Sequence, residues 1–414
     1  MQKRTDASDP PRSRNQRSAA SAPDGVWPPG GWRAQLRRRL LAWYDRHRRE
    51  LPWRGSRDPY CVWVSEIMLQ QTQVATVSEY YPRFVQALPD VRRLAAADET
   101  TVLRLWEGLG YYRRARQLHR AARVVVDELG GELPQSLEGW CGLPGVGRYT
   151  AGAILSIAHD EPHPILEANT QRLYSRLLAL EGDVSRGAGR RLLWIAAEQL
   201  LSRQRPGDLN QALMELGSTV CLPRRPSCSE CPLAGLCPTY KRGWQERIGG
   251  PQRGTPLEDV REAAVVVRRR GRVLVVLRGD EGRWAGLWDF PRFTLDSHQA
   301  ADIAHELIAK VAAATGSRIA PPEWLTTMRH GVTRFRITLE CYEARHIGAL
   351  PPAAQRRGDR PPANGVPGSS RHSLRQGGLA CTAVEVRWLR PVDLATLPLS
   401  TTGRRLADLL CEPK

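Results

Sequence analysis

The stretch Leu143-Pro-Gly-Val-Gly-Arg-Tyr-Thr150 decides the fold class expected for this chain. Two glycines in the spacing G-x-G precede an apolar segment that we expect to be helical from about Thr150. Such a turn lets backbone N–H groups at a helix N-terminus face an anion. A lone G-x-G is weak evidence, because any tight turn between helices can contain one. The full string LPGVGRYTAGAI is more specific, and it predicts that Gly145 and Gly147 bind a DNA phosphate without reading base sequence.

The region around this turn, from Trp32 to about Gly243, has a helical pattern throughout, with Pro and Gly at the joins. We expect a helical domain over 29–245, preceded by a disordered basic tail over 1–28. Apolar residues recur at helical spacing in five segments, which are Leu36–Arg49, Tyr60–Phe84, Thr100–Leu105, Arg113–Leu129 and Arg191–Leu201.

After a polar linker over 246–258 the pattern changes to that of a separate α+β domain, expected over 259–400. A Pro/Gly/Arg-rich stretch over 348–378 predicts a disordered insertion within it. We expect a turn at Arg270-Gly271 between two strands, further strands later in the domain, and one helix. The predicted strands are Glu262–Val267, Arg272–Arg278, Arg336–Glu343 and Val384–Leu389, and the predicted helix is His298–Ala314.

Bulk composition limits the class of partner. The chain has 414 residues, a formal net charge of +18 and a sequence pI of about 10.1. Composition bias is the plain explanation, but the positive charge extends through the folded region, so we favour a nucleic acid partner. No apolar run approaches the length of a membrane span. Scattered cysteines and a polar start predict a reducing cytosolic setting, in a bacterial cytosol or nucleoid, and we expect a monomer.

Four cysteines, Cys221, Cys228, Cys231 and Cys237, form a C-x6-C-x2-C-x5-C run. Thiolates this close in sequence can converge on one metal centre, and four of them satisfy an iron–sulfur cluster. Structural zinc is the serious rival, although zinc ribbons usually show two C-x2-C pairs. A disulfide framework would also use four cysteines, but nothing in the sequence suggests secretion.

Two acidic residues are candidates for catalysis. Glu66 lies in an apolar helical segment that is followed by Gln70, Gln71, Thr72 and Gln73. Its alternative explanation is a carboxylate at a helix N-terminus, favoured by the helix dipole. Glu167 and Asn169 open a later helix, and N-capping is the alternative there. If Glu167 faced Glu66 across a cleft, the pair would give the two-carboxylate arrangement of glycosyl chemistry.

The stretch Gly108-Leu-Gly-Tyr-Tyr-Arg-Arg-Ala-Arg116 combines glycines, adjacent tyrosines and three arginines. We interpret it as a surface for the minor groove or phosphates that carries an aromatic wedge, although the tyrosines can equally belong to a core.

Together these motifs resemble the MutY family of adenine DNA glycosylases, within the endonuclease III superfamily. The stretches that carry the resemblance are LPWR (51–54), SEIMLQQTQV (65–74), GLGYYRRARQLHRAA (108–122), LPGVGRYTAGAILSIA (143–158) and the four-cysteine loop. The resemblance implies a mostly α, two-lobed helix–hairpin–helix glycosylase fold with a [4Fe–4S] cluster, followed by a Nudix-like α+β domain. The implied partner is double-stranded DNA with an adenine:8-oxoguanine or adenine:guanine mispair.

The resemblance also implies residue roles. Glu66 would protonate N7 of an adenine that is flipped out of the duplex, and Glu167 would stabilise the sugar cation. Gln71 and Tyr111 match residues that wedge into the duplex, and Thr72 and Leu109 match contacts on the oxidised-guanine side. The pocket around the adenine and its sugar would contain Arg54, Tyr149 and Asn169.

The chain departs from the family pattern at two places, and its lysines bear on the type of reaction. Glu167 stands where the family has Asp, which keeps the charge but adds a methylene. The lysines are Lys3, Lys241, Lys310 and Lys414, so no Schiff-base amine lies in residues 4–240, and we predict a monofunctional enzyme. In the C-terminal domain, Val332-Thr333-Arg334 stands where the family has a Phe-Ser-His loop that checks the oxidised guanine. Thr333 keeps the hydroxyl, so the resemblance implies that it contacts the lesion.

The C-terminal domain resembles a Nudix module through Leu287-Trp-Asp-Phe-Pro291. The stretch Ser297–Val311 has only Asp302 and Glu306 as acidic residues, so we expect a binding module without the metal site of a hydrolase. This disfavours a nucleotide-pyrophosphate hydrolase. Two hypotheses about function stay open beside adenine excision, which are a glycosylase for another mismatch such as thymine:guanine, and a catalytically weak lesion-binding or redox-sensing protein.

Overall fold

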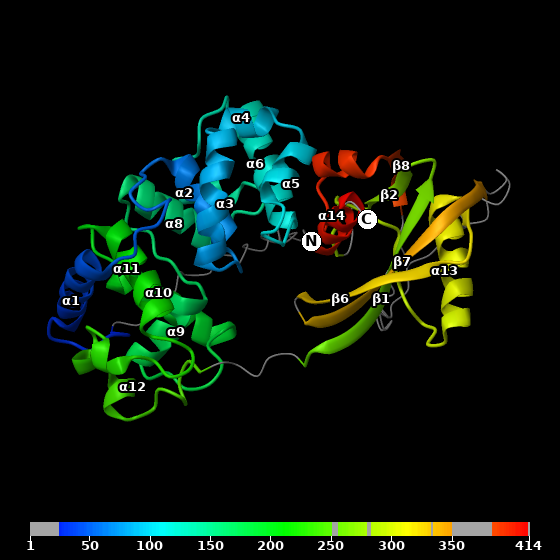
Figure 1. Ribbon diagram of the computed structural model, residues 1–414. Coiled ribbons are helices and arrows are strands. Elements are labelled where there is room, and N and C mark those ends of the chain that lie inside the picture. The colour runs from blue at the N-terminus through cyan, green and yellow to red at the C-terminus, as the bar shows by residue number, and fades with distance from the viewer. Residues whose placement is uncertain (1–24, 251–255, 280–282, 333, 350–382, 413–414) are drawn as a thin grey trace, which may run out of the picture. The chain divides into compact units, whose positions relative to one another are not determined.

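The computed structural model describes residues 25–250, 256–279, 283–332, 334–349 and 383–412 (Figure 1). The chain divides into two compact units, one made of residues 1–46, 166–201 and 212–250, and the other of residues 47–165, 202–211 and 251–414. Both units are therefore assembled from separate stretches of sequence. Among the described residues, no helix has the length and apolar character needed to cross a membrane.

The first unit is helical. Its helices are α1 (Trp32–His47), α9 (Ala168–Leu177), α10 (Gly187–Leu200) and the short α12 (Pro238–Lys241), with the 3-10 turns η1 (Cys228–Glu230) and η2 (Ala234–Leu236) between the cysteines. The helix α11 (Pro206–Thr219) spans the boundary between the two units. Trp27 corrects the predicted limit of the disordered tail at residue 28. Its side chain is 5% exposed, and its indole N–H donates to the Ala196 carbonyl at 2.9 Å.

The second unit contains a helical lobe over residues 47–165. Its helices are α2 (Pro59–Leu69), α3 (Val74–Ala87), α4 (Val91–Ala96), α5 (Glu99–Trp106), α6 (Arg113–Glu128), α7 (Leu137–Cys141) and α8 (Arg148–His159). One apolar core holds them together, with the buried rings of Trp63, Trp106 and Trp140 in it. The predicted continuous helix Tyr60–Phe84 is two helices, because the chain breaks at Gln70–Gln73, where Gln71 has a left-handed φ of 58°.

The C-terminal domain belongs to the same unit and is built on a mixed sheet. Its elements are β1 (Glu258–Arg269), β2 (Arg272–Arg278), β3 (Trp288–Asp289), β4 (Arg292–Thr294), α13 (Ala300–Thr315), β5 (Ser317–Ile319), β6 (Glu323–Val332), β7 (Phe335–Ala349), β8 (Ala383–Leu389), η4 (Pro391–Thr396) and α14 (Thr401–Cys411). The strand order is β3-β2-β1-β7-β5, and β4, β6 and β8 pair with β1, β7 and β2 respectively. The β1 and β7 strands run parallel from Glu258↔Phe335 to Arg268↔Arg345.

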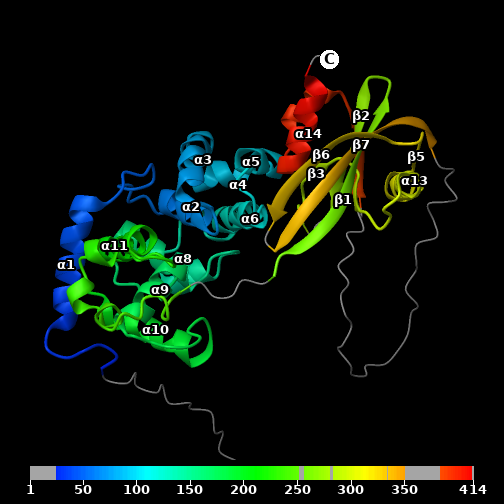
Figure 2. The same ribbon diagram turned by 60° about the horizontal axis from the view of Figure 1, so that its bottom comes forward.

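Successive side chains of β1 point to opposite faces of the sheet, and they pack into two different cores. Ala263, Val265 and Val267 pack with α13, whereas Ala264 and Val266 pack with α14 and η4. The two helices accordingly lie on opposite faces of the sheet (Figure 2). The predicted turn Arg270-Gly271 is confirmed as a two-residue hairpin loop with both φ angles positive.

Two domain limits differ from the prediction. The C-terminal domain continues past residue 400, because Leu406 and Ala407 of α14 fill the core on one face of the sheet. The predicted insertion over 348–378 begins inside β7, and residues 350–378 lie outside the described part of the chain, as do residues 1–24 of the predicted tail.

Candidate functional site

Glu66 is the buried carboxylate of the helical lobe. Asp58 caps α2 by accepting from the Tyr60 N–H at 2.8 Å, and Pro59 occupies the first helical position, so the helix begins where both residue types favour it. Glu66 therefore falls in the last turn of α2, and its side chain is only 4% exposed. This excludes the alternative of an N-terminal carboxylate stabilised by the helix dipole, since the C-terminal end disfavours negative charge.

Tyr149 reaches this carboxylate from α8. Gly147 is the N-cap of α8, and Tyr149 is the second residue of the helix. Its hydroxyl donates to Oε2 of Glu66 at 2.7 Å, and the neighbouring Thr150 hydroxyl lies 3.3 Å from Nε2 of Gln70. The hairpin turn and the carboxylate, which are about eighty residues apart in sequence, are thus joined by a short hydrogen bond.

The hairpin turn needs glycine at Gly145. Its φ is +79°, and a Cβ atom there would lie 2.8 Å from Cβ of Gln117. The adjacent N-terminus of α8 presents first-turn N–H groups, which have no carbonyl partners within their own helix. The predicted phosphate-binding role of Gly145 and Gly147 fits this geometry and stays a prediction.

Two loops of the lobe carry strained exposed residues. Gln71 between α2 and α3 has φ of 58° and is exposed, and Tyr111 between α5 and α6 has φ of 49° and is 43% exposed. Positive φ is uncommon outside glycine and recurs at functional sites. Leu109 is 5% exposed and packs into the core of the lobe, so Gln71 and Tyr111 are the exposed side chains of the predicted wedge.

Arg54 and Thr72 make contacts within the lobe. Nη1 of Arg54 donates to the Arg49 carbonyl at 2.8 Å, which holds the guanidinium beside the chain that leads into α2. The Thr72 hydroxyl accepts from Nη2 of Arg114 at 2.9 Å. Their predicted DNA contacts stay predictions.

Glu167 in the first unit is the N-cap of α9. Its Oε2 accepts from the Asn169 N–H at 2.7 Å, and its Oε1 accepts from the Thr170 N–H at 2.8 Å. In return, the Glu167 N–H donates to the Thr170 hydroxyl. N-capping, the alternative explanation of this residue, is therefore what the structure shows. Burial raises the pKa of Glu167, and the hydrogen bonds from these N–H groups oppose that rise. Oδ1 of Asn169 accepts from Nη2 of Arg172 at 2.8 Å.

The four cysteines line one pocket, which they share with Leu173, Arg176, Leu233 and Tyr240 among others. Arg176 is 2% exposed and organises the chain around the pocket. Its guanidinium donates to the carbonyls of Leu222, Gln245 and Ile248 at 2.7–2.9 Å, and to the Cys221 sulfur at 3.3 Å.

The donor set at this pocket is made of four thiolates in apolar surroundings. An iron–sulfur cluster takes one thiolate at each of several irons, so the residues present fit a cluster.

Comparisons with known proteins identify the same parts of the chain. Residues 64–198 match the HhH-GPD superfamily of base excision DNA repair proteins, residues 221–237 match the iron–sulfur binding domain of endonuclease III, and residues 263–409 match the NUDIX domain. Mouse adenine DNA glycosylase is 41% identical over 66% of this chain and 64% of its own length, and the rat protein is 38% identical over 78% and 73%. A thermostable thymine-DNA glycosylase structure is 28% identical over 51% of this chain and 97% of its own, with a TM-score of 0.47.

The chain belongs to the adenine DNA glycosylase family. It spans slightly less than two thirds of the mouse protein. The predicted fold class is confirmed, since a helix–hairpin–helix glycosylase region and a NUDIX domain follow one another as expected. The loop Cys221–Cys237 is an iron–sulfur site, as the family resemblance implied.

The C-terminal domain of this family member lacks the acidic helix of a hydrolase in the described residues. On α13, Glu306 accepts from the N–H groups of Asp296 and Ser297 at 3.1 and 2.9 Å and from Lys310 at 2.5 Å. Burial raises its pKa, but these hydrogen bonds prevail and lower it to about 2. Glu306 is therefore committed to structural contacts. Thr333, the predicted lesion contact, lies outside the described residues.

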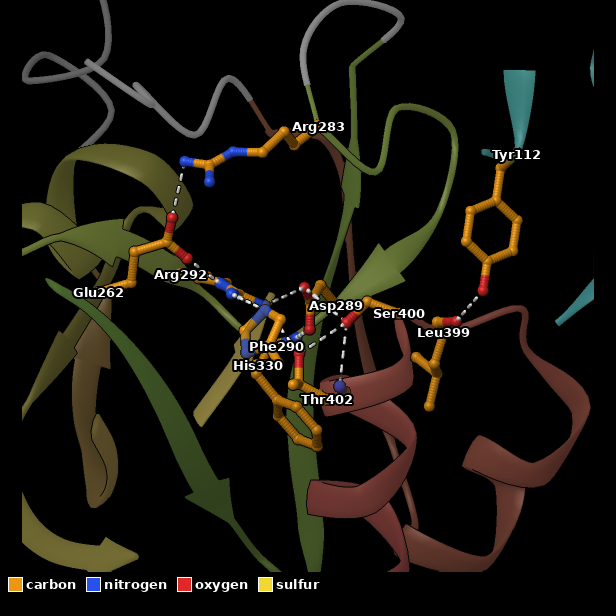
Figure 3. Close-up of polar contacts among 11 residues, drawn as sticks. Tyr112, Glu262, Arg283, Asp289, Phe290, Arg292, His330, Leu399, Ser400 and Thr402 are labelled. Carbon is orange, nitrogen blue, oxygen red and sulfur yellow. Dashed lines mark hydrogen bonds and ion pairs between the residues drawn. The ribbon is translucent and has the colours of Figure 1, made fainter. Parts of the chain in front are cut away.

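A buried ionic network links β1, β4, β6 and α14 (Figure 3). Glu262 is fully buried and accepts from Nε of Arg292 at 2.6 Å and from Nη2 of Arg283 at 2.8 Å. Nη1 of Arg292 also donates to the Thr402 hydroxyl at 2.8 Å, and its Nη2 lies 3.4 Å from Nε2 of His330. Sequence alone gave no sign of this network, because its members come from five different parts of the chain.

Proposed function

We propose that this chain hydrolyses the N-glycosidic bond of an adenine mispaired with 8-oxoguanine or guanine, leaving an abasic site. The observation that supports the proposal most directly is the buried Glu66 carboxylate, hydrogen-bonded to Tyr149 beside a glycine hairpin. Family membership and the iron–sulfur loop support it further.

The chemistry that we propose begins with adenine extruded from the stack, because its glycosidic bond is inaccessible in duplex DNA. Protonated Glu66 donates its proton to N7 of adenine, the bond between C1′ and N9 breaks, and its electrons leave with the base. The Tyr149 hydroxyl, which donates to Oε2 of Glu66, orients the carboxyl group for this transfer. The Glu66 carboxylate then accepts a proton from the water that adds to C1′, which restores the acid.

Glu167 is proposed to stabilise the cationic sugar electrostatically. Both of its oxygens accept backbone N–H groups. These bonds favour the charged form and hold the carboxylate in place, which suits electrostatic stabilisation better than attack as a mobile nucleophile. The first turn of α9 thus fixes the longer Glu side chain at the position where the family resemblance predicted Asp.

The enzyme is proposed to be monofunctional. A Schiff-base mechanism needs an amine nucleophile, and no lysine lies between residues 4 and 240. Tyr149 stands in the hairpin where the resemblance places the lysine of strand-cleaving relatives, and its hydroxyl is directed to Glu66.

The decisive experiment is single-turnover cleavage of a duplex with one adenine:8-oxoguanine pair, with and without alkali, by the wild type, Glu66→Gln and Glu167→Asp. We expect nicking only after alkali, and a loss of at least about a hundredfold in Glu66→Gln, because amide cannot supply the proton. Thymine:guanine and adenine:guanine duplexes in the same assay test the alternative specificity. Tight lesion binding without base release by the wild type would instead support a non-catalytic lesion-binding protein.

A further inference from the structure

Arg114 is a buried cation on the apolar face of α6. Its neighbours on that helix face are apolar, with Ala115, Leu118, Ala122 and Val125 all buried. The Arg114 side chain is 8% exposed, so it is not part of the arginine surface that the sequence predicted for residues 113–116, whereas Arg113 is exposed.

Nη1 of Arg114 caps the C-terminal end of α2. Nη1 donates to the carbonyls of Ile67 and Met68, both at 2.8 Å, and to the Gln70 carbonyl. The last four carbonyls of a helix have no partners within the helix, and a guanidinium is well suited to satisfy several of them. This contact fixes the point at which the chain leaves α2, one turn after Glu66.

The second terminal nitrogen of Arg114, Nη2, forms hydrogen bonds with both strained loops. Nη2 donates to the Thr72 hydroxyl at 2.9 Å in the first loop and to the Gly110 carbonyl at 3.2 Å in the second. The guanidinium carbon also lies 5.4 Å from the Trp106 ring centroid and 5.5 Å from that of Tyr111. A single rigid planar group therefore sets the spacing between residues 70–72 and 109–111.

Only arginine can make this set of contacts. The partners are carbonyl and hydroxyl oxygens divided between Nη1 and Nη2, whereas a lysine ammonium is a point charge with three donors on one nitrogen. Burial lowers the pKa of Arg114 to about 10, which still leaves it charged at neutral pH. The bonds to the carbonyl dipoles offset the cost of burying that charge.

Each of the loops that Arg114 joins contains a non-glycine residue at positive φ, which is Gln71 in the first loop and Tyr111 in the second. A left-handed conformation is strained for a non-glycine residue, and it persists where the surrounding contacts over-determine the backbone. The contacts of Arg114 with Gln70, Thr72 and Gly110, next to both strained positions, supply such a constraint.

We propose that Arg114 is a positioning residue that couples the loops 70–73 and 108–111, so that Gln71 and Tyr111 enter the duplex as one rigid wedge. The role of the wedge in DNA rests on the proposed function, whereas the coupling of the loops is a property of the free protein. The two parts are tested separately.

Hydrogen exchange of the DNA-free protein tests the coupling. In Arg114→Lys we expect the amides of both loops to exchange at least about tenfold faster, with the central turns of α6 and α8 unchanged. The matched control is Arg120→Lys, an exposed arginine on the same helix. Faster exchange in one loop alone, or equally across the whole lobe, would overturn the proposal in favour of local packing or general destabilisation.

Thr72→Val provides the same test without removing the buried charge, in case Arg114→Lys does not fold. It deletes one hydroxyl in the first loop, and we expect faster exchange at Gly110 and Tyr111 in the second. Unchanged exchange there would contradict the coupling.

A double-mutant cycle tests the wedge in DNA. Gln71→Ala and Tyr111→Ala are measured singly and together for single-turnover adenine release, in the wild type and in Arg114→Lys. We expect a strongly non-additive effect in the wild type that becomes additive in the Arg114→Lys background. Additivity in both backgrounds would overturn the joint wedge. A wild type that releases no adenine would instead count against the proposed function, and the exchange result would still decide the coupling.

Discussion

His330 is a histidine that the fold keeps neutral. It lies on β6 beside the Arg292 guanidinium, whose Nη2 is 3.4 Å from its Nε2, and its ring is 6.2 Å from that of Trp284 (Figure 3). Burial, followed by the charge of Arg292, lowers the pKa of His330 to about 4, while Glu262 opposes them. The charges of Arg283 and Arg405 act in the same direction as Arg292.

This environment predicts an acid sensitivity of the C-terminal domain. The unfolded chain protonates His330 near pH 6.5 and the folded chain only near pH 4, so stability is lost as pH falls between these values. We expect a loss of about 1–2 kcal/mol at pH 5 relative to pH 8, absent in His330→Gln. Urea unfolding at both pH values measures it, with the exposed His305→Gln as control. Equal pH dependence in all three proteins would refute the assignment.

Residue type and position together decided which site residues the sequence could predict. Glu66 was predictable because a carboxylate in an apolar segment is conspicuous. Arg114 was not, because it stands in a run of arginines where a surface position is the natural expectation, and only the phase of α6 turns it inward. The apolar residues at 115, 118, 122 and 125 were the one available signal of that phase.

At the scale of elements, the first turn of α9 has both a structural role and a proposed catalytic role, because its capping carboxylate is Glu167. Glu167→Ala should cost about 1 kcal/mol of local stability, which corresponds to roughly fivefold faster exchange of the Asn169 and Thr170 amides. Glu167→Asp should keep the protection, since Asp is a good N-cap. Exchange that stays unchanged in Glu167→Ala would show that the cap is not what orders this turn.

Helix boundaries were harder to predict than helix existence. The apolar spacing of Tyr60–Phe84 continues through the break at Gln70–Gln73, so the pattern alone gives no reason to stop. Arg114, more than forty residues away in sequence, contacts the chain at this break. The parallel pairing of β1 with β7 was equally hidden, since it joins residues far apart in the chain.

At the scale of the whole molecule, the C-terminal domain contacts both ends of the loop 108–111. Glu107 accepts from Nε of Arg404 at 2.7 Å and from the Leu399 N–H at 3.3 Å. The Tyr112 hydroxyl lies 3.5 Å from the Leu399 carbonyl (Figure 3), and Leu287 is buried in the core of the helical lobe. The residues that flank the proposed wedge are therefore held by the C-terminal domain.

These contacts predict that the lobe and the C-terminal domain stabilise each other. Glu107→Ala leaves Arg404 without its carboxylate, and we expect a loss of about 3 kcal/mol, because the pair is largely buried. The control Glu99→Ala removes a surface pair with Arg116 and should cost less than about 1 kcal/mol. Calorimetry of both variants tests this, and equal shifts in unfolding temperature would show that the contact contributes little.

The link between Trp27 and Ala196 has a consequence for biosynthesis. The two residues are 169 positions apart, and the guanidinium of Arg37 likewise donates to the Leu200 carbonyl at the end of α10. At about 5–20 residues per second, α1 leaves the ribosome roughly 10–30 s before its partner exists. Residues 47–165 of the intervening helical lobe form one contiguous stretch, so most of the lobe can begin to fold first. The cysteine ligands Cys221–Cys237 follow α10 in the chain, so a site with all four ligands exists only after α1, most of the lobe and α10 have been translated.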